Sequence, residues 1–249
     1  MSNIVQYEGW SLEEAETEAK QVSKFQATEI LKLKPGKNKL RFLPKLPGHG
    51  SPFQIVWQHF VEGPERPVVF PCPWRMDQSR CPVCDFGNKI SRSNNPADRD
   101  AARKLWPSMR VFANAVDRSA QEDGPKIVAM PKTVYEALIN IRRDEDAGGD
   151  FTDPKEGFDI IIEREGTGLN TRYRVATART NSELENMDWI GMQHDLTRYA
   201  ELPTRDVMES AMALLNDTAP PIDVTPSAPP TKRLSRTAAD DIYSDDIPY

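Results

Sequence analysis

The sequence predicts an α+β fold that is mainly β, a five-stranded barrel of the OB type with an inserted subdomain and peripheral helices. Short segments with strand periodicity recur along residues 30–178 and are interrupted by only one or two helical patterns. This order favours a small Greek-key barrel over a parallel α/β sheet. An irregular stretch that contains all three cysteines interrupts the strands, and after Asp217 the composition changes to Pro, Thr, Ser and Ala. A stretch of that composition cannot bury enough apolar surface to form a core.

The first expected element is a short helix over residues 11–24, with a capping box that begins at Ser11. The period then changes to two, which predicts a β-hairpin of residues 30–34 and 39–44 around the turn at residues 35–38. Basic side chains are expected on its outward face.

The remaining elements follow from the same two periodicities. Strands are expected at residues 53–60, 67–70, 109–116, 126–130, 158–164 and 172–178. Helices are expected at residues 96–105, where Asn95 is the N-cap and Pro96 the first position, and at 132–142, 195–200 and 205–215. Residues 71–96 show no periodicity and are expected to be irregular. We therefore expect an arm at residues 1–25, one domain at 26–216 with a metal-binding subdomain at about 57–92, and a disordered tail at 217–249.

Charge is unevenly distributed along the chain. The formal net charge of the 249 residues is −6. Residues 26–120 nevertheless hold 16 Lys and Arg against 8 Asp and Glu, whereas residues 121–216 hold 11 against 19. A polyanion responds to the local field of a basic face rather than to the sum over the chain, so the total charge does not exclude a nucleic-acid partner.

Membrane and secretory signals are missing from the sequence. No apolar run approaches the ~18–20 residues that span a bilayer. The first six residues lack a basic and an apolar region, so we expect no signal peptide, no membrane partner and an intracellular location.

The three cysteines and one histidine have the spacing of a metal site. Cys81-Pro-Val-Cys84 is a C-x2-C pair, and Cys72 and His59 supply two further ligands. A Cys3His set is typical of a closed, tetrahedral, structural site, so one structural Zn²⁺ ion is expected. His49 is a competing fourth ligand, and we prefer His59 because it lies at the end of a predicted strand. His194 is expected to be a surface residue at a helix start.

The predicted metal site leaves two alternative functions open, an enzyme and a protein-binding adaptor. Asp77 and Asp85 lie close to the cysteines, so a zinc-dependent DNA-processing enzyme is an alternative if the metal has an open position. A zinc-stabilised adaptor that binds protein is another. A closed four-ligand site favours neither catalysis nor a bound water, so the chain is expected not to be an enzyme.

Basic and aromatic residues interleave around the cysteines. The basic ones are Lys39, Arg41, Arg75, Arg80, Lys89, Arg92, Arg103, Lys104 and Arg110, and the aromatic ones are Trp57, Phe60, Trp74, Phe86, Trp106 and Phe112. Cationic grooves follow phosphates and aromatic faces stack on unpaired bases, so the combination favours single-stranded DNA over duplex. From this set we expect DNA contacts from Lys39, Arg41, Trp74, Arg75, Arg80, Arg92, Trp106, Arg110 and Phe112. Phe112 and Trp106 could equally belong to the core.

The spacing of the predicted metal ligands resembles that of the zinc-containing single-stranded DNA-binding proteins of T-even-like bacteriophages. Phe112-Ala-Asn114, residues 40–44 and the strands from Phe158 to Tyr173 are also similar to that family. The resemblance implies an OB-fold core, a basic cleft, and roles in DNA replication, recombination and repair in the cytoplasm of an infected bacterial cell. It places Arg110, Phe112, Lys132, Arg172 and Tyr173 near the DNA. It also implies self-association through a basic N-terminal arm, which residues 1–7 do not show.

The last residues resemble a second group of proteins. The chain ends in Asp245-Asp246-Ile247-Pro248-Tyr249, which is similar to the C-terminal tip of bacterial single-stranded DNA-binding proteins. The resemblance implies that replication and recombination proteins dock on this tip. A tethered acidic segment can also compete with DNA for a basic cleft.

Overall fold

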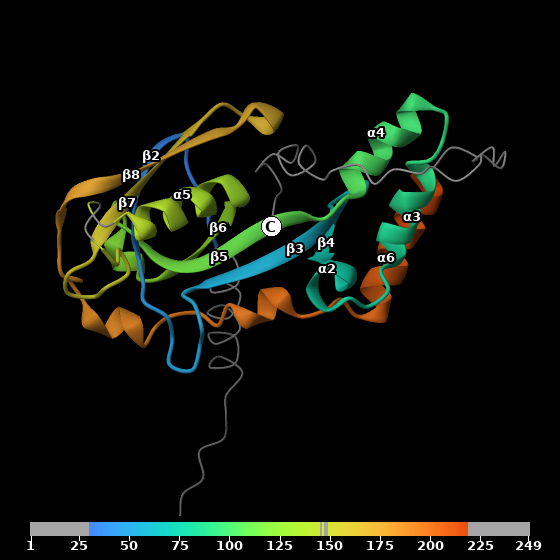
Figure 1. Cartoon of the computed structure of the whole chain (residues 1–249). Coiled ribbons are helices and arrows are strands. Elements are labelled where there is room, and N and C mark those ends of the chain that lie inside the picture. Colours follow the sequence, from blue (N-terminus) through green and yellow to red (C-terminus); the bar gives the residue numbers. More distant parts are fainter. Residues whose placement is uncertain (1–29, 145, 147–148, 219–249) are drawn as a thin grey trace, which may run out of the picture.

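The computed structural model describes residues 30–144, 146 and 149–218. The helix predicted at residues 11–24 and the tail beyond residue 218 lie outside this part. The described residues form one eight-stranded sheet with helices at both ends (Figure 1). The mixed α+β class expected from the sequence is confirmed, and the arrangement agrees with an OB-like fold that carries an added subdomain.

The strands are β1 (Ile30–Leu31), β2 (Gly36–Phe42), β3 (Phe53–Val61), β4 (Val68–Pro71), β5 (Ser108–Asp117), β6 (Lys126–Pro131), β7 (Phe158–Glu165) and β8 (Arg172–Asn181). The helices are α2 (Pro73–Asp77), α3 (Pro82–Ile90), α4 (Pro96–Leu105), α5 (Lys132–Arg143) and α6 (Arg205–Thr218). Short 3₁₀ turns are η1 (Gln121–Asp123), η3 (Gly168–Asn170), η4 (Met187–Ile190) and η5 (Thr197–Ala200). The predicted helix at 96–105 is confirmed, and the Asn95 side chain accepts a hydrogen bond from the backbone N–H of Ala97 (3.0 Å).

Strand β5 organises the sheet. It pairs antiparallel with β2, β3 and β6, and β2 in turn pairs with β7, which pairs with β8. Its residues from Arg110 to Asp117 are all buried, because side chains pack on both of its faces. Among the described residues no pairing joins β8 back to β1, so the barrel is open at that seam.

The two largest hydrophobic cores of the described residues flank β3 and β5. The barrel core joins β2, β5 and β7 to α5, and Phe42, Val111 and Leu138 lie at its centre. The second core lies in what we call the outer lobe, formed by residues 59–107 together with α6. It packs Phe70, Val83 and Leu105 against α6. Strand β3 therefore begins in the barrel and ends in the outer lobe (Figure 1).

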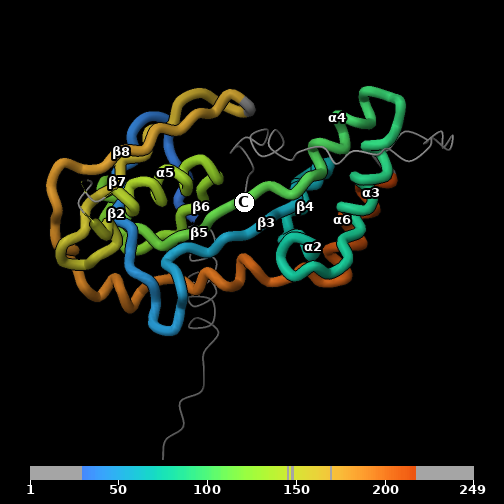
Figure 2. Tube along the Cα trace, viewed as in Figure 1, coloured from blue at the N-terminus to red at the C-terminus, as the bar shows by residue number. Residues whose placement is uncertain are grey.

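The segment between β8 and α6 crosses the opposite face of the sheet from α5. Residues 182–204 pass below β5 and β3 before they reach α6 (Figure 2). Leu196 and Tyr199 of this segment pack on Val56 and Phe112. The side chain of Asn114 exchanges two hydrogen bonds of 2.9 Å with the backbone of His194. This segment thus ties the outer lobe to the barrel.

Two expectations about local structure were wrong. Residues 30–34 and 39–44 do not form a hairpin, since β1 pairs parallel with β6 whereas β2 pairs with β5 and β7. The Asn38 side chain bonds the N–H and the carbonyl of Lys34 (both 2.8 Å), and this local turn leaves each strand to find another neighbour. Residues 71–96 are not irregular, because they contain α2 and α3.

In the described ranges, no helix is both long and apolar enough to cross a bilayer.

Candidate metal centre and nucleic-acid interface

The outer lobe gathers the four predicted metal ligands. His59 lies near the end of β3, Cys72 follows β4, and Cys81 and Cys84 lie at the start of α3. Both α2 and α3 begin with a proline directly after a cysteine, at a position that suits its fixed φ and missing N–H. These two prolines turn the chain immediately behind Cys72 and Cys81, which directs both thiols inward.

The ligand atoms already lie at the spacing of a tetrahedral site. The Nε2 atom of His59 is 3.2 Å from the sulfur of Cys81 and 3.3 Å from that of Cys84, and the sulfurs of Cys72 and Cys84 are 3.5 Å apart. All four atoms lie within 4.8 Å of one another, and all four residues are buried. Donor atoms around a tetrahedral zinc ion are separated by about 3.5–3.8 Å, from metal–ligand distances of about 2.0–2.3 Å. The group can therefore hold one metal ion.

A backbone carbonyl group orients the histidine. The Nδ1–H of His59 donates a hydrogen bond of 2.7 Å to the carbonyl oxygen of Leu105, the last residue of α4. This contact fixes the tautomer with its lone pair on Nε2, the atom that faces the sulfurs. The imidazole thus joins β3 and α4 to the metal group.

The group also favours a positive charge at its centre. Burial lowers the pKa of His59, but the sulfurs of Cys72 and Cys81, which accept hydrogen bonds from a protonated imidazole and attract its charge, outweigh burial and raise that pKa to about 9. Contacts with Cys72 and Cys84 lower the pKa of Cys81 and favour its thiolate. The same crowding raises the pKa of Cys84. A divalent cation satisfies these groups, because it binds thiolates and neutral imidazole together.

The other candidate ligands lie elsewhere. Asp77 accepts a hydrogen bond from the N–H of Ser79, and Asp85 forms an exposed ion pair with Arg80 (3.0 Å). Among the described residues neither carboxylate belongs to the metal group. A catalytic zinc would need a base beside it, so the geometry does not favour the hydrolytic alternative.

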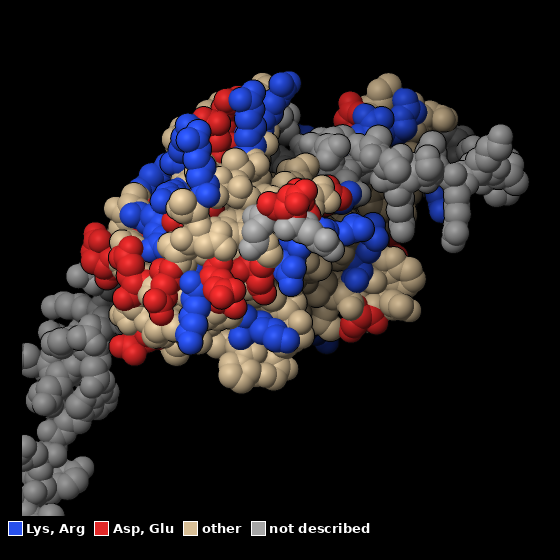
Figure 3. Space-filling view, turned by 60° about the vertical axis from the view of Figure 1, so that its left-hand side comes forward, with Lys and Arg blue, Asp and Glu red and all other residues tan. Residues whose placement is uncertain are grey.

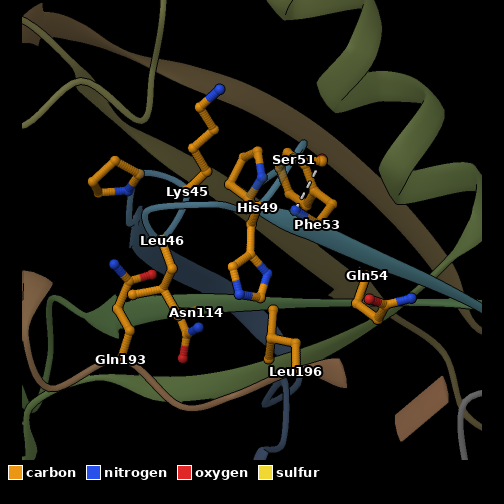
Figure 4. Close-up of a pocket in the computed structure, with 11 residues that line it drawn as sticks. Lys45, Leu46, His49, Ser51, Phe53, Gln54, Asn114, Gln193 and Leu196 are labelled. Carbon is orange, nitrogen blue, oxygen red and sulfur yellow. Dashed lines mark hydrogen bonds between the residues drawn. The ribbon is translucent and has the colours of Figure 1, made fainter. Parts of the chain in front are cut away.

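His49 and His194 are not ligands either. His49 lines a shallow pocket between the loop that follows β2, Asn114 and Gln193 (Figure 4). His194 is half-buried, and its Nε2 lies 3.0 Å from the carbonyl oxygen of Pro125. The preference for His59 over His49 agrees with the group that the structure forms.

Most residues predicted to contact DNA lie at the surface. Trp74 is 51% exposed, and Arg80, Arg92 and Arg172 are also exposed. Arg75, Trp106, Lys132 and Tyr173 are half-buried. Lys39 is exposed but forms an ion pair of 3.1 Å with Asp159. Figure 3 shows many Lys and Arg side chains along the upper edge of one face, and a band of Asp and Glu lower down in which further Lys and Arg are interspersed.

Three of the predicted DNA contacts were wrong, because their side chains lie inside the protein. Arg41 is fully buried and donates to the carbonyl oxygens of Asp153 (2.8 Å) and Ser182 (2.7 Å). Phe112 is also fully buried, and its ring stacks on Tyr199 with centroids 4.3 Å apart.

Arg110 is 4% exposed and lies in β5 between Val56 of β3 and Pro131 of β6. Strand β5 from Arg110 onward and the end of β2 are covered on both faces, which a period of two does not reveal.

One surface pair was not predicted. The guanidinium of Arg75, in α2, lies 4.4 Å from the ring centroid of Trp57, in β3. Trp57 is two residues before His59, so its side chain lies on the same face of the strand as the metal ligand. That spacing was visible in the sequence, whereas the position of α2 beside β3 was not.

The comparisons with known proteins agree with this geometry. The profile of a protein family described as "gp32 DNA binding protein like" matches residues 34–216. A comparison with curated protein sequences gives no match. The matched residues include both cores, the metal group and every exposed residue predicted to contact DNA.

Proposed function

Because the chain belongs to the gp32-like DNA-binding protein family, we propose that it binds single-stranded DNA with little sequence preference. The family is one of DNA-binding proteins and not of enzymes. The proposed role is to cover and protect unpaired strands rather than to cleave or join them.

The observation that carries this proposal is the surface of β3 between the barrel and the outer lobe. Ile55, whose side chain is 37% exposed, and Trp57 present apolar and aromatic surface there. Trp74 and Arg75 of α2 lie beside the strand. Unpaired bases stack on such rings while cations hold the phosphates, and duplex DNA hides its base faces. The surface therefore suits a single strand.

We propose that the bound metal is one zinc ion with a structural role. Three thiolates and one imidazole are the ligands of closed zinc sites, and the buried group leaves no open side for substrate. The ion would hold β3, α3 and the end of α4 together, and so position α2 beside Trp57. It supplies folding free energy to the outer lobe and no chemistry at the DNA.

The test is binding to a fluorescent oligo-dT and to duplex DNA of equal length over a salt series. We expect tight binding to the single strand, weak binding to the duplex, and a log–log salt slope of about −0.7 for each phosphate contacted. Equal binding to both, or binding that does not change with salt, would contradict the proposal.

The biological setting is also part of the proposal. We propose roles in DNA replication, recombination and repair within the cytoplasm of an infected bacterial cell, with self-association on long single strands. The tip Asp245-Asp246-Ile247-Pro248-Tyr249 would recruit partner proteins. Deletion of residues 240–249 should tighten DNA binding and abolish capture of replication proteins. A deletion that alters neither property would remove the tip from the proposal.

A further inference from the structure

Trp57 lies where it can receive a nucleobase. Its side chain shares a face of β3 with Ile55 on the barrel side and His59 on the lobe side, because alternate residues of a strand point the same way. Ile55 is 37% exposed and His59 is buried. The half-buried indole therefore stands at the boundary between the open strip of β3 and the closed metal lobe.

Arg75 covers one face of this ring. Its guanidinium carbon lies 4.4 Å from the ring centroid, which is the geometry of a cation–π contact. Arg75 forms no ion pair with any residue in the described part of the chain. Within the described ranges the guanidinium is held by the planar surface of the indole, so Arg75 can exchange that surface for a phosphate and leave the ring open.

We propose that Trp57 is a base-stacking subsite and that Arg75 occupies it until DNA binds. This inference rests on the proposed single-strand binding. A base that reaches the exposed part of β3 between α5 and α2 stacks on the indole ring of Trp57 in place of the Arg75 guanidinium. Arg75 then pairs with an adjacent phosphate. The displaced cation thereby contributes to the salt dependence of binding. Trp74, the residue before Arg75 in α2, is 51% exposed and offers a further aromatic ring on the same helix.

The purely structural alternative makes different predictions. Trp57 also packs in part against the core of the outer lobe. If it served only that core, an apolar residue of similar bulk would preserve DNA binding, and loss of Arg75 would lower the melting temperature without altering the salt slope. Stacking instead requires an aromatic ring, and displacement requires the charge of Arg75.

The experiment compares Trp57→Leu, Trp57→Phe and Arg75→Ala in the full chain, with equal metal content, by oligo-dT titration. We expect Trp57→Leu to weaken binding about 5- to 100-fold and Trp57→Phe less than about 3-fold. Arg75→Ala should weaken binding and reduce the magnitude of the salt slope by about 0.7. Met192→Ala is the control, because Met192 is 56% exposed, lies beside Gly124 and belongs to the segment that crosses the opposite face of the sheet from α5.

Fluorescence gives a second reading that does not depend on the leucine variant folding. Saturating oligo-dT should quench tryptophan emission of the wild type, and Trp57→Phe should bind yet lose part of that quench. Unchanged affinity in Trp57→Leu, or an unchanged quench in Trp57→Phe, overturns the subsite while single-strand binding stands. If the wild type shows no preference for single strands, the proposed function fails and the subsite fails with it.

Discussion

The imidazole of His59 bonds the carbonyl oxygen of Leu105 across 2.7 Å, and this contact couples the metal group to the end of α4. The bond joins residues that are 46 positions apart in the sequence. One nitrogen of the ring is committed to the backbone, so the other is presented to the three sulfurs. Metal content and the fold of the outer lobe are therefore expected to change together.

Replacement of a metal ligand tests that coupling. Cys84→Ser should reduce zinc from about one ion per chain to near zero and lower the melting temperature, since binding free energy at such sites is folding free energy. The measurements are metal content by atomic emission and thermal unfolding by circular dichroism. His49→Ala is the matched control, because that exposed histidine lies outside the metal group and should change neither value. Full metal content in Cys84→Ser would disprove the ligand set.

The buried arginine should affect stability rather than DNA contact. Arg41→Ala leaves the carbonyl oxygens of Asp153 and Ser182 without the donor that Arg41 supplies, and it empties a fully buried site, so it should reduce the free energy of unfolding by about 3 kcal/mol. Lys39→Ala removes an ion pair to Asp159 from a side chain that is 54% exposed, and should cost less than about 1 kcal/mol. Urea unfolding of both variants measures the difference. Equal costs would mean that burial of Arg41 does not determine its role.

Arg41 is buried and Lys39 is exposed, and this difference shows how far the sequence predicts the fold and the site. Alternation predicted where the strands lie, and the residue types at His59 and the cysteines predicted the metal group, because that chemistry needs specific side chains. The alternation of apolar and polar residues could not show that β5 and the end of β2 are covered on both faces, so Arg41 was expected at the surface and Phe112 was left between the core and the DNA face. The sequence could not predict that the carbonyl oxygen of Leu105 accepts the hydrogen bond from His59, because every residue has a backbone carbonyl group.

The short helices α2 and α3 were missed for a related reason. Helices of five and nine residues are too short for a clear period of 3.6. Each is defined by a proline that follows a cysteine, and by the metal group against which it packs. The partners of β1 and β2 likewise depend on the whole sheet, so the local hairpin pattern gave the wrong pairing.

Arg172, a basic residue on the β7–β8 hairpin, tests where single-stranded DNA binds. Arg172 is exposed at the start of β8, and Arg172→Ala should reduce the magnitude of the salt slope for oligo-dT by about 0.7. Arg205→Ala is the matched control, because Arg205 is equally basic but lies on α6, where it pairs with Glu209. It should leave the slope unchanged. Equal effects of the two changes would indicate a diffuse electrostatic contribution instead of a defined path.

The stacked pair Phe112 and Tyr199 tests how the segment that crosses below β5 is held. The two rings lie 4.3 Å apart and 13° from parallel, and Phe112 is fully buried. Phe112→Ala should reduce the free energy of unfolding by about 3–5 kcal/mol, because it removes a whole ring from the core.

Tyr199→Ala should cost less, since Tyr199 is only half-buried, and the double mutant should reveal a coupling of about 0.5–1.5 kcal/mol. Urea unfolding of the four proteins measures this cycle. If the two changes were additive, the rings would be independent neighbours, and the attachment of residues 182–204 would depend on Leu196 and on the bonds between Asn114 and His194.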